Sequence, residues 1–122
     1  GHMMKLLHNS VCHSIFLINC EILNVAKSYG ITDTDVIDVF NKSNARSYIS
    51  ENRFPNNILN GKFNGKSTIK NLKKDLKMMN SILKNSKSKK KYTELSNEIL
   101  SKIDDKLNME DFTNIYKMWE KI

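Results

Sequence analysis

Apolar side chains recur every three or four positions along most of this chain, which is the spacing of one face of an α-helix. The pattern predicts a long first helix over residues 4–29, and Gly30 after it suits the left-handed cap that ends many helices. Thr32 followed by Asp35 resembles a capping box and predicts the start of a second helix. No segment shows a convincing strand pattern, so the sequence favours an all-α fold.

The second half of the sequence keeps the helical pattern. Residues 44–60 are predicted to form a helix in two pieces, because Pro55 lacks a backbone donor and disfavours helix at Phe54. Ser67 is predicted to cap a further helix, which a basic loop over roughly 84–91 follows. Its apolar stripe consists of Ile69, Leu72, Leu76, Met79 and Leu83. Tyr92, Leu95, Ile99 and Ile103 predict a fifth helix, and Phe112, Ile115, Tyr116 and Trp119 predict a short sixth one. We therefore expect one all-α domain of about six helices.

The predicted first helix is unusual in its length and in its apolar coverage. At about 26 residues it is roughly twice as long as a typical globular helix. Its apolar residues occupy more than one face, namely Leu6, Leu7, Ile15, Phe16, Ile18, Ile22 and Val25. A helix that is apolar on several faces is buried on several faces, which a protein of 122 residues can hardly achieve alone. We expect a second domain or subunit to cover it, and a homo-oligomer in particular.

Cysteine usage and the apolar pattern suggest a cellular compartment. Residues Gly1–Met3 have the sequence left by a cleaved purification tag, so the domain is taken as residues 4–122. No run of roughly 18 apolar residues and no secretory signal is visible, which predicts a protein without a membrane span. Cys12 and Cys20 would lie about 12 Å apart on one helix, too far for a disulfide between them. The sequence thus indicates a reduced, cytoplasmic protein.

The net charge of +7 permits phosphate binding without specifying it. Of the 20 basic residues only two are arginine, the residue that most often reads base edges, and the remaining lysines are scattered. Those two, Arg46 and Arg53, suit a planar, bidentate contact. The lysine-rich run at 87–91 is more typical of a solvated loop than of a nucleic-acid site. No specific nucleic-acid partner is therefore expected.

The start of the first helix carries the most chemically suggestive cluster. Lys5 and Asn9 are four residues apart and share a helical face, with His8 beside them. On their own these residues are more typical of a solvated helix start than of a site. His8 and Cys12 could suggest a metal, but His13 turns away from them and zinc needs more ligands. No metal is expected.

Taken in order along the sequence, several motifs resemble one family. KLLHN at 5–9 is followed by the long helix to AKSYGIT, by ENRFPNNILNGKF at 51–63 and by LKKDLK at 72–77. KxxHN and KDL are weak signals alone, whereas ENRFPxxIL with its G-x-F turn and a later KDL is much more specific. Over roughly residues 5–115 the sequence resembles the C-terminal helical domain of the 3-hydroxyisobutyrate dehydrogenase family. These are the β-hydroxyacid dehydrogenases, relatives of 6-phosphogluconate dehydrogenase.

The resemblance implies an oxidoreductase and a set of site residues. In the family, the lysine that matches Lys5 is the catalytic acid/base, and the asparagine that matches Asn9 helps to hold the substrate, a small hydroxyacid. His8 stands where most hydroxyacid members have Asn, and we take it as a second substrate-binding candidate. The lysine of KDL, here Lys74, would lie near an NAD or NADP cofactor, with Asp75 beside it as a supporting residue.

The resemblance also implies a partner domain. The N-terminal half of the family is a Rossmann domain whose glycine-rich turn holds the pyrophosphate, and no G-x-G-x-x-G occurs here. We therefore expect this protein to be the C-terminal half of such an enzyme, inactive without its Rossmann domain. Two other interpretations stay open: a helical dimerisation domain without catalysis, and a basic nucleic-acid-binding module.

Overall fold

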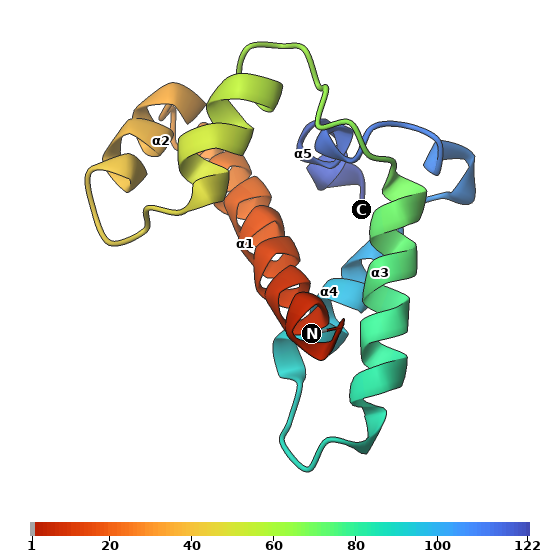
Figure 1. The fold of residues 1–122 in the computed structure, drawn as a ribbon. Helices are drawn as coiled ribbons and strands as arrows, with labels where there is room; N and C mark the ends of the chain where they lie inside the picture. The colour runs from red at the N-terminus through yellow and green to blue at the C-terminus, as the bar shows by residue number, and fades with distance from the viewer. Residues whose placement is uncertain (1) are drawn as a thin grey trace.

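The computed structural model describes residues 2–122, and Figure 1 shows them arranged around one long helix. The helices are α1 (His2–Ser28), α2 (Asp33–Asn41), η1 (Ile49–Ile58), α3 (Ile69–Ile82), α4 (Lys91–Ser101) and α5 (Ile115–Met118). Short 3₁₀ turns complete the fold: η2 (Leu83–Asn85), η3 (Asp105–Leu107), η4 (Phe112–Asn114) and η5 (Trp119–Lys121). Extended pairing in residues 2–122 is limited to one isolated bridge, between Thr68 and Asp111. The prediction of an all-α fold with a long first helix is confirmed.

The junction between α1 and α2 forms where the sequence predicts it. Gly30 has a φ of +77°, and the N–H of Ile31 donates to the carbonyl of Ala26 at 3.0 Å, which closes the end of α1. The hydroxyl of Thr32 then accepts the N–H of Asp35 at 3.2 Å and satisfies a free donor at the start of α2. Both caps depend on residues close in sequence, which is why the pattern locates them.

The prediction of two helical pieces around Pro55 is wrong, because η1 is one continuous helix with wide turns. The N–H of Leu59 donates to the carbonyl of Phe54, five residues earlier, at 2.7 Å. In such a turn, the donor that Pro55 lacks would face the carbonyl of Ser50. The side chain of Asn41, at the end of α2, donates to that carbonyl at 3.0 Å instead. The helix continues through the proline because a neighbouring helix supplies the missing hydrogen bond.

The start of α3 also differs slightly from the prediction. Thr68 rather than Ser67 caps the helix, since its hydroxyl accepts the N–H of Asn71 at 3.2 Å. The buried stripe is confirmed for Ile69, Leu72, Leu76 and Met79. Leu83 lies in the turn after the helix and is only partly buried. The stripe therefore ends one turn earlier than the spacing indicates.

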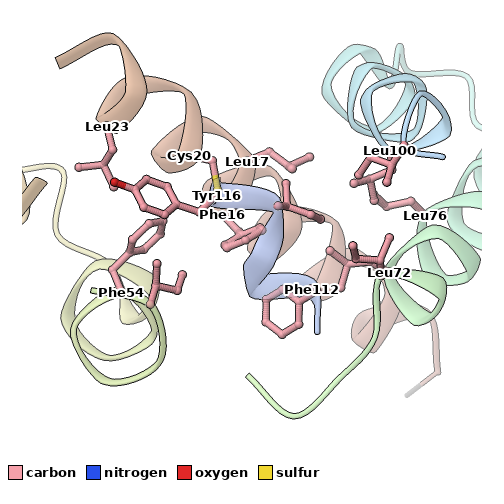
Figure 2. Packing of buried hydrophobic residues seen from close by; sticks show 14 of the residues in the cluster. Phe16, Leu17, Cys20, Leu23, Phe54, Leu72, Leu76, Leu100, Phe112 and Tyr116 are labelled. Atoms are coloured by element: carbon pink, nitrogen blue, oxygen red, sulfur yellow. The ribbon is translucent and has the colours of Figure 1, made fainter. Parts of the chain in front are cut away.

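The core gathers around the middle of α1, where aromatic rings from four elements meet (Figure 2). The ring of Phe16 lies 5.2 Å from that of Phe112 and 6.0 Å from that of Phe54, measured between centroids. Phe54 in turn meets Tyr116 edge-on at 5.8 Å. These offset and edge-on arrangements add stabilisation beyond the apolar area that they bury. The core thereby holds η1, η4 and α5 against α1.

The rest of the fold covers α1 on its inward faces only. The helix buries Leu6, Phe16, Leu17, Cys20, Leu23 and Ala26, and it exposes Leu7, Val11, Ile18, Ile22 and Val25. Among residues 2–122, α1 is the one helix long and apolar enough to cross a membrane. A single helix of this kind is weak evidence for a membrane span, because the core helix of a soluble protein and a signal sequence near the N-terminus pass the same test.

Candidate functional site

The first turns of α1 present Lys5, His8 and Asn9 side by side. Lys5 and His8 are exposed, whereas Asn9 is half-buried. His8 Nδ1 lies 3.3 Å from Asn9 Oδ1, and its Nε2 lies 3.5 Å from Cys12 Sγ. The Lys5 ammonium takes part in none of the ion pairs found in residues 2–122. The cluster therefore offers an uncommitted cation one turn away from an amide that His8 contacts.

The contact between His8 and Cys12 does not extend to a metal centre in the part of the protein that the structure describes. Within residues 2–122, His, Cys, Asp and Glu side chains nowhere assemble in groups of three or more at metal-binding distance. A structural zinc ion takes four ligands and a catalytic one takes three from the protein. The chemistry available at this end of α1 is therefore that of an amine, an imidazole and an amide.

The second half of the predicted site lies on α3, which runs antiparallel to α1 (Figure 1). Lys74 is exposed and, within the described residues, joins no ion pair. Asp75 is turned toward α1, where its Oδ2 lies 3.7 Å from His13 Nε2. The two residues of the KDL motif thus face different surroundings: Lys74 faces solvent and Asp75 faces the neighbouring helix.

The contact between His13 and Asp75 sets the distance between the two candidate lysines. Because an α-helix rises 1.5 Å per residue, Lys5 lies about 12 Å along α1 from His13. Lys74 is next to Asp75 and therefore lies at the level of His13. The structure brings Lys74 and Asp75 to the middle of α1, and it does not bring Lys74 into contact with Lys5.

His13 is a site-bordering residue to which sequence reasoning assigned no role. The prediction that it turns away from His8 and Cys12 does not say where it goes, and the structure places it in the contact between α1 and α3. Its side chain is only 16% exposed, and its Nε2 has no hydrogen-bond partner within residues 2–122. Burial lowers the pKa of His13 below its ordinary value of 6.5, and the charge of Asp75 opposes this shift. The sequence does show that His13 lies four residues after Asn9 and therefore on the same side of α1, which is the signal that could have identified it.

Lys73, immediately before the predicted Lys74, has a structural role. Its ammonium donates to the Ile103 carbonyl at 2.6 Å, to Asn108 Oδ1 at 2.7 Å and to Asp105 Oδ1 at 3.1 Å. These bonds tie α3 to the segment that follows α4. Of the two neighbouring lysines, only Lys74 is left free to meet a ligand.

The two arginines do not form the free bidentate fork that their rarity suggests. Arg53 lies over the ring of Phe112, 5.2 Å from its centroid, and donates to Asn57 Oδ1 at 3.0 Å. Arg46 is exposed and pairs with Glu51 at 3.5 Å. Both guanidinium groups are engaged with neighbours within the protein, so neither is a strong candidate for substrate binding.

The residues of the candidate site can provide one contact to a dinucleotide, but not a complete dinucleotide-binding site. Lys74 can donate a charge-assisted hydrogen bond to a phosphate or carbonyl oxygen. A pyrophosphate is usually held by a glycine-rich turn before a helix, and the sequence has no such turn. Two hollows on the described surface, both beside α1, are lined by residues other than Lys5, His8, Asn9 and Lys74. The candidate site is an open face that a second domain could cover.

Comparison with known families gives a match that spans nearly the whole sequence. The family model described as NAD-binding of NADP-dependent 3-hydroxyisobutyrate dehydrogenase matches residues 1–119. No curated protein matches the sequence. The matched range contains every residue of the candidate site on α1 and α3.

Proposed function

The chain belongs to the NAD-binding family of NADP-dependent 3-hydroxyisobutyrate dehydrogenase, and from this membership we propose that it is the catalytic helical half of an NAD(P)-dependent hydroxyacid dehydrogenase. The match supports NAD(P) as the cofactor of the full enzyme. In the proposal, a Rossmann domain precedes this helical domain in the full enzyme. Lys5 is the acid/base, Asn9 and His8 hold the substrate, and Lys74 contacts the cofactor.

The observation that carries the proposal is the arrangement at the start of α1, within the matched range. Lys5 and Asn9 lie one turn apart on the same side of a rigid helix, and Lys5 is not paired with an acid among residues 2–122. Residues four apart on a helix have Cβ atoms about 5–6 Å apart, so the amine of Lys5 and the amide of Asn9 can both reach one small hydroxyacid.

Oxidation of a hydroxyacid requires a base for the hydroxyl proton, and in the proposal Lys5 Nζ takes it. A lysine becomes a base near neutral pH when its surroundings withdraw it from water or place another cation beside it. Lys5 is exposed in the described structure. The proposal therefore requires a second domain to close over the first turns of α1 and to exclude water there.

His8 orients the amide of Asn9 in this scheme. When His8 Nδ1 carries the proton, it donates to Asn9 Oδ1, which lies 3.3 Å away. Both N–H groups of the Asn9 amide are then free to donate to the substrate carboxylate. This arrangement adds a positioning role to the substrate contact proposed for His8.

On α3, the proposal assigns cofactor contact to Lys74 and support to Asp75. When bound, the nicotinamide would accept the hydride that leaves the carbinol carbon as Lys5 takes the hydroxyl proton. The Lys74 ammonium donates to an oxygen of the cofactor, a charge-assisted bond worth about 1.5–3 kcal/mol. Such a single bond is far from micromolar affinity, so the helical domain alone should bind NAD(P) weakly. Asp75 acts indirectly, through its contact with His13 at 3.7 Å.

The test is made on the enzyme completed by its Rossmann domain, with NAD(P)H formation measured on a panel of 3-hydroxyacids. Lys5→Ala should lower kcat/KM by roughly 10²–10⁴-fold, the usual share of a positioned proton-transfer group. Lys5→Arg should restore almost none of this loss, because arginine keeps the charge but does not release a proton at working pH. Lys62→Ala, at another exposed lysine, is the matched control and should leave turnover unchanged.

Thermal melts of the same variants separate catalysis from folding. Lys5 is exposed in the first turns of a helix, so both substitutions should melt close to wild type. Near-wild-type turnover in Lys5→Ala or in Lys5→Arg would remove the acid/base role. A completed protein that turns over no hydroxyacid would favour the alternative of a helical dimerisation domain.

A further inference from the structure

A hollow of about 430 Å³ lies between α1 and α4, on a part of the molecule that the proposed function does not use. Its walls are mostly apolar and include Ile15 and Ile18 of α1, Leu95 and Ile99 of α4, and Trp119. Ile18 and Leu95 are about half exposed, at 49% and 50%. At 3.6 residues per turn, Ser14 and Ile18 lie on the opposite side of α1 from Lys5 and Asn9. The hollow is therefore distinct from the candidate active site.

A second hollow of about 360 Å³ adjoins the first and has a different chemical character. The two share Ser14, Ile15 and Tyr92, so one opens beside the other. The second is rimmed by three consecutive lysines, Lys89–Lys91, together with the hydroxyl-bearing Ser10 and Thr93. Lys90 is paired with Glu94 at 3.2 Å, whereas Lys89 and Lys91 join no ion pair in residues 2–122.

Hydroxyl contacts among the residues that line the two hollows connect α1 to α4. Ser10 Oγ lies 2.6 Å from Thr93 Oγ1, and Ser14 Oγ lies 3.3 Å from Ser96 Oγ. Small side chains of this kind let two helices approach closely, and both Thr93 and Ser96 are buried. The groove is thus formed by the packing of the two helices and does not depend on a ligand to open it.

We propose that the two hollows form one binding site for an amphiphilic anion, a linear aliphatic carboxylate such as a medium-chain fatty acid. The carboxylate would lie against Lys89 and Lys91, and the alkyl tail would run between Ile18 and Leu95 toward Trp119. Both volumes fall in the range of small-molecule sites, about 300–1,000 Å³. The lysine end selects for negative charge, and Glu21 at the apolar end disfavours a second anionic group there.

The experiment is titration of the protein with hexanoate, octanoate and decanoate, followed by calorimetry and by the fluorescence of Trp119. Trp119 is the single tryptophan of the sequence and lines the apolar hollow, so it reports directly on occupancy. Each added methylene that leaves water should tighten the Kd by about fourfold. Decanol, which has the same alkyl tail without the charge, should bind at least tenfold more weakly than decanoate.

Two pairs of variants locate the site. Leu95→Glu places a carboxylate in the groove and should abolish decanoate binding, whereas Val39→Glu, at an apolar residue of α2 that is 60% exposed, should not. Lys89→Gln combined with Lys91→Gln should weaken the binding of decanoate by at least tenfold. Lys62→Gln, at another exposed lysine, should leave the decanoate affinity unchanged. Lys5→Ala should also leave it unchanged, which makes this test independent of the proposed catalysis.

Three results would overturn the proposal. One is an affinity that does not increase with tail length, and another is equal binding by wild type and Leu95→Glu. The third is a wild-type dimer, measured by light scattering, whose mass does not change when decanoate is added and which Leu95→Glu converts to a monomer. That last result would show that a second copy of the protein covers the groove.

Discussion

Replacing Lys73 with methionine should destabilise this fold, although a surface lysine on a helix is usually dispensable. The Lys73 side chain is only 17% exposed, and its ammonium donates to the Ile103 carbonyl, to Asn108 and to Asp105. Asp105 is 92% exposed, so this pair contributes little. The bonds to the Ile103 carbonyl and to Asn108 are charge-assisted and part-buried, and their loss should together cost about 2–4 kcal/mol.

A thermal melt followed by circular dichroism measures this loss. For a protein of this size, 1 kcal/mol corresponds to roughly 4 °C in Tm, so Lys73→Met should melt about 8–16 °C below wild type. Lys74→Met is the matched control, because it makes the same change one residue further along α3 at an exposed lysine. It should melt within about 2 °C of wild type. Equal melting of the two variants would show that the bonds of Lys73 do not hold α3 to the segment after α4.

Three further predictions test other parts of the structure. Because the folded state lowers the pKa of His13, the unfolded protein binds the proton more readily below about pH 6.5, and the free energy of unfolding should fall there as the pH drops. His13→Gln should remove that part of the pH dependence, which can reach about 1.4 kcal/mol per pH unit. Gly65→Ala would place a Cβ 2.5 Å from the ring of Phe112, so urea melts should show a loss of about 1–3 kcal/mol. Asn41→Ala should cost about 1–3 kcal/mol in the same assay, because it leaves the buried carbonyl of Ser50 without a donor.

The helix boundaries show which parts of the fold can be predicted from sequence. Gly30 and Thr32 act through neighbours within five residues, so their caps are visible in the pattern. The continuity of η1 through Pro55 is not visible there. It depends on the side chain of Asn41, which reaches the carbonyl of Ser50 only after α2 has packed against η1. Local rules fail at this proline because a tertiary contact replaces the hydrogen bond that the rules assume to be lost.

The candidate site shows the same division. The spacing of Lys5 and Asn9 suffices to place them on one side of α1, because a helix brings residues four apart together. The difference between Lys73 and Lys74 is not encoded in their spacing, since the partners of Lys73 lie some thirty residues further along the sequence. The KDL motif contains Lys74, which the structure leaves exposed, but it gives no indication that Asp75 faces the other helix.

The contact between His13 and Asp75 places a half-buried carboxylate and a largely buried imidazole between α1 and α3. Two apolar side chains would pack between α1 and α3 without the desolvation of an imidazole and a carboxylate, and such replacements often stabilise a protein. An apolar contact would, however, tolerate a shift of one helix along the other, whereas a pair of polar groups 3.7 Å apart is lost when either helix moves by one turn. The registry of α1 and α3 also sets the separation of Lys5 from Lys74. The polar contact therefore favours one registry of α1 and α3, and with it one separation of the proposed acid/base Lys5 from the proposed cofactor contact Lys74.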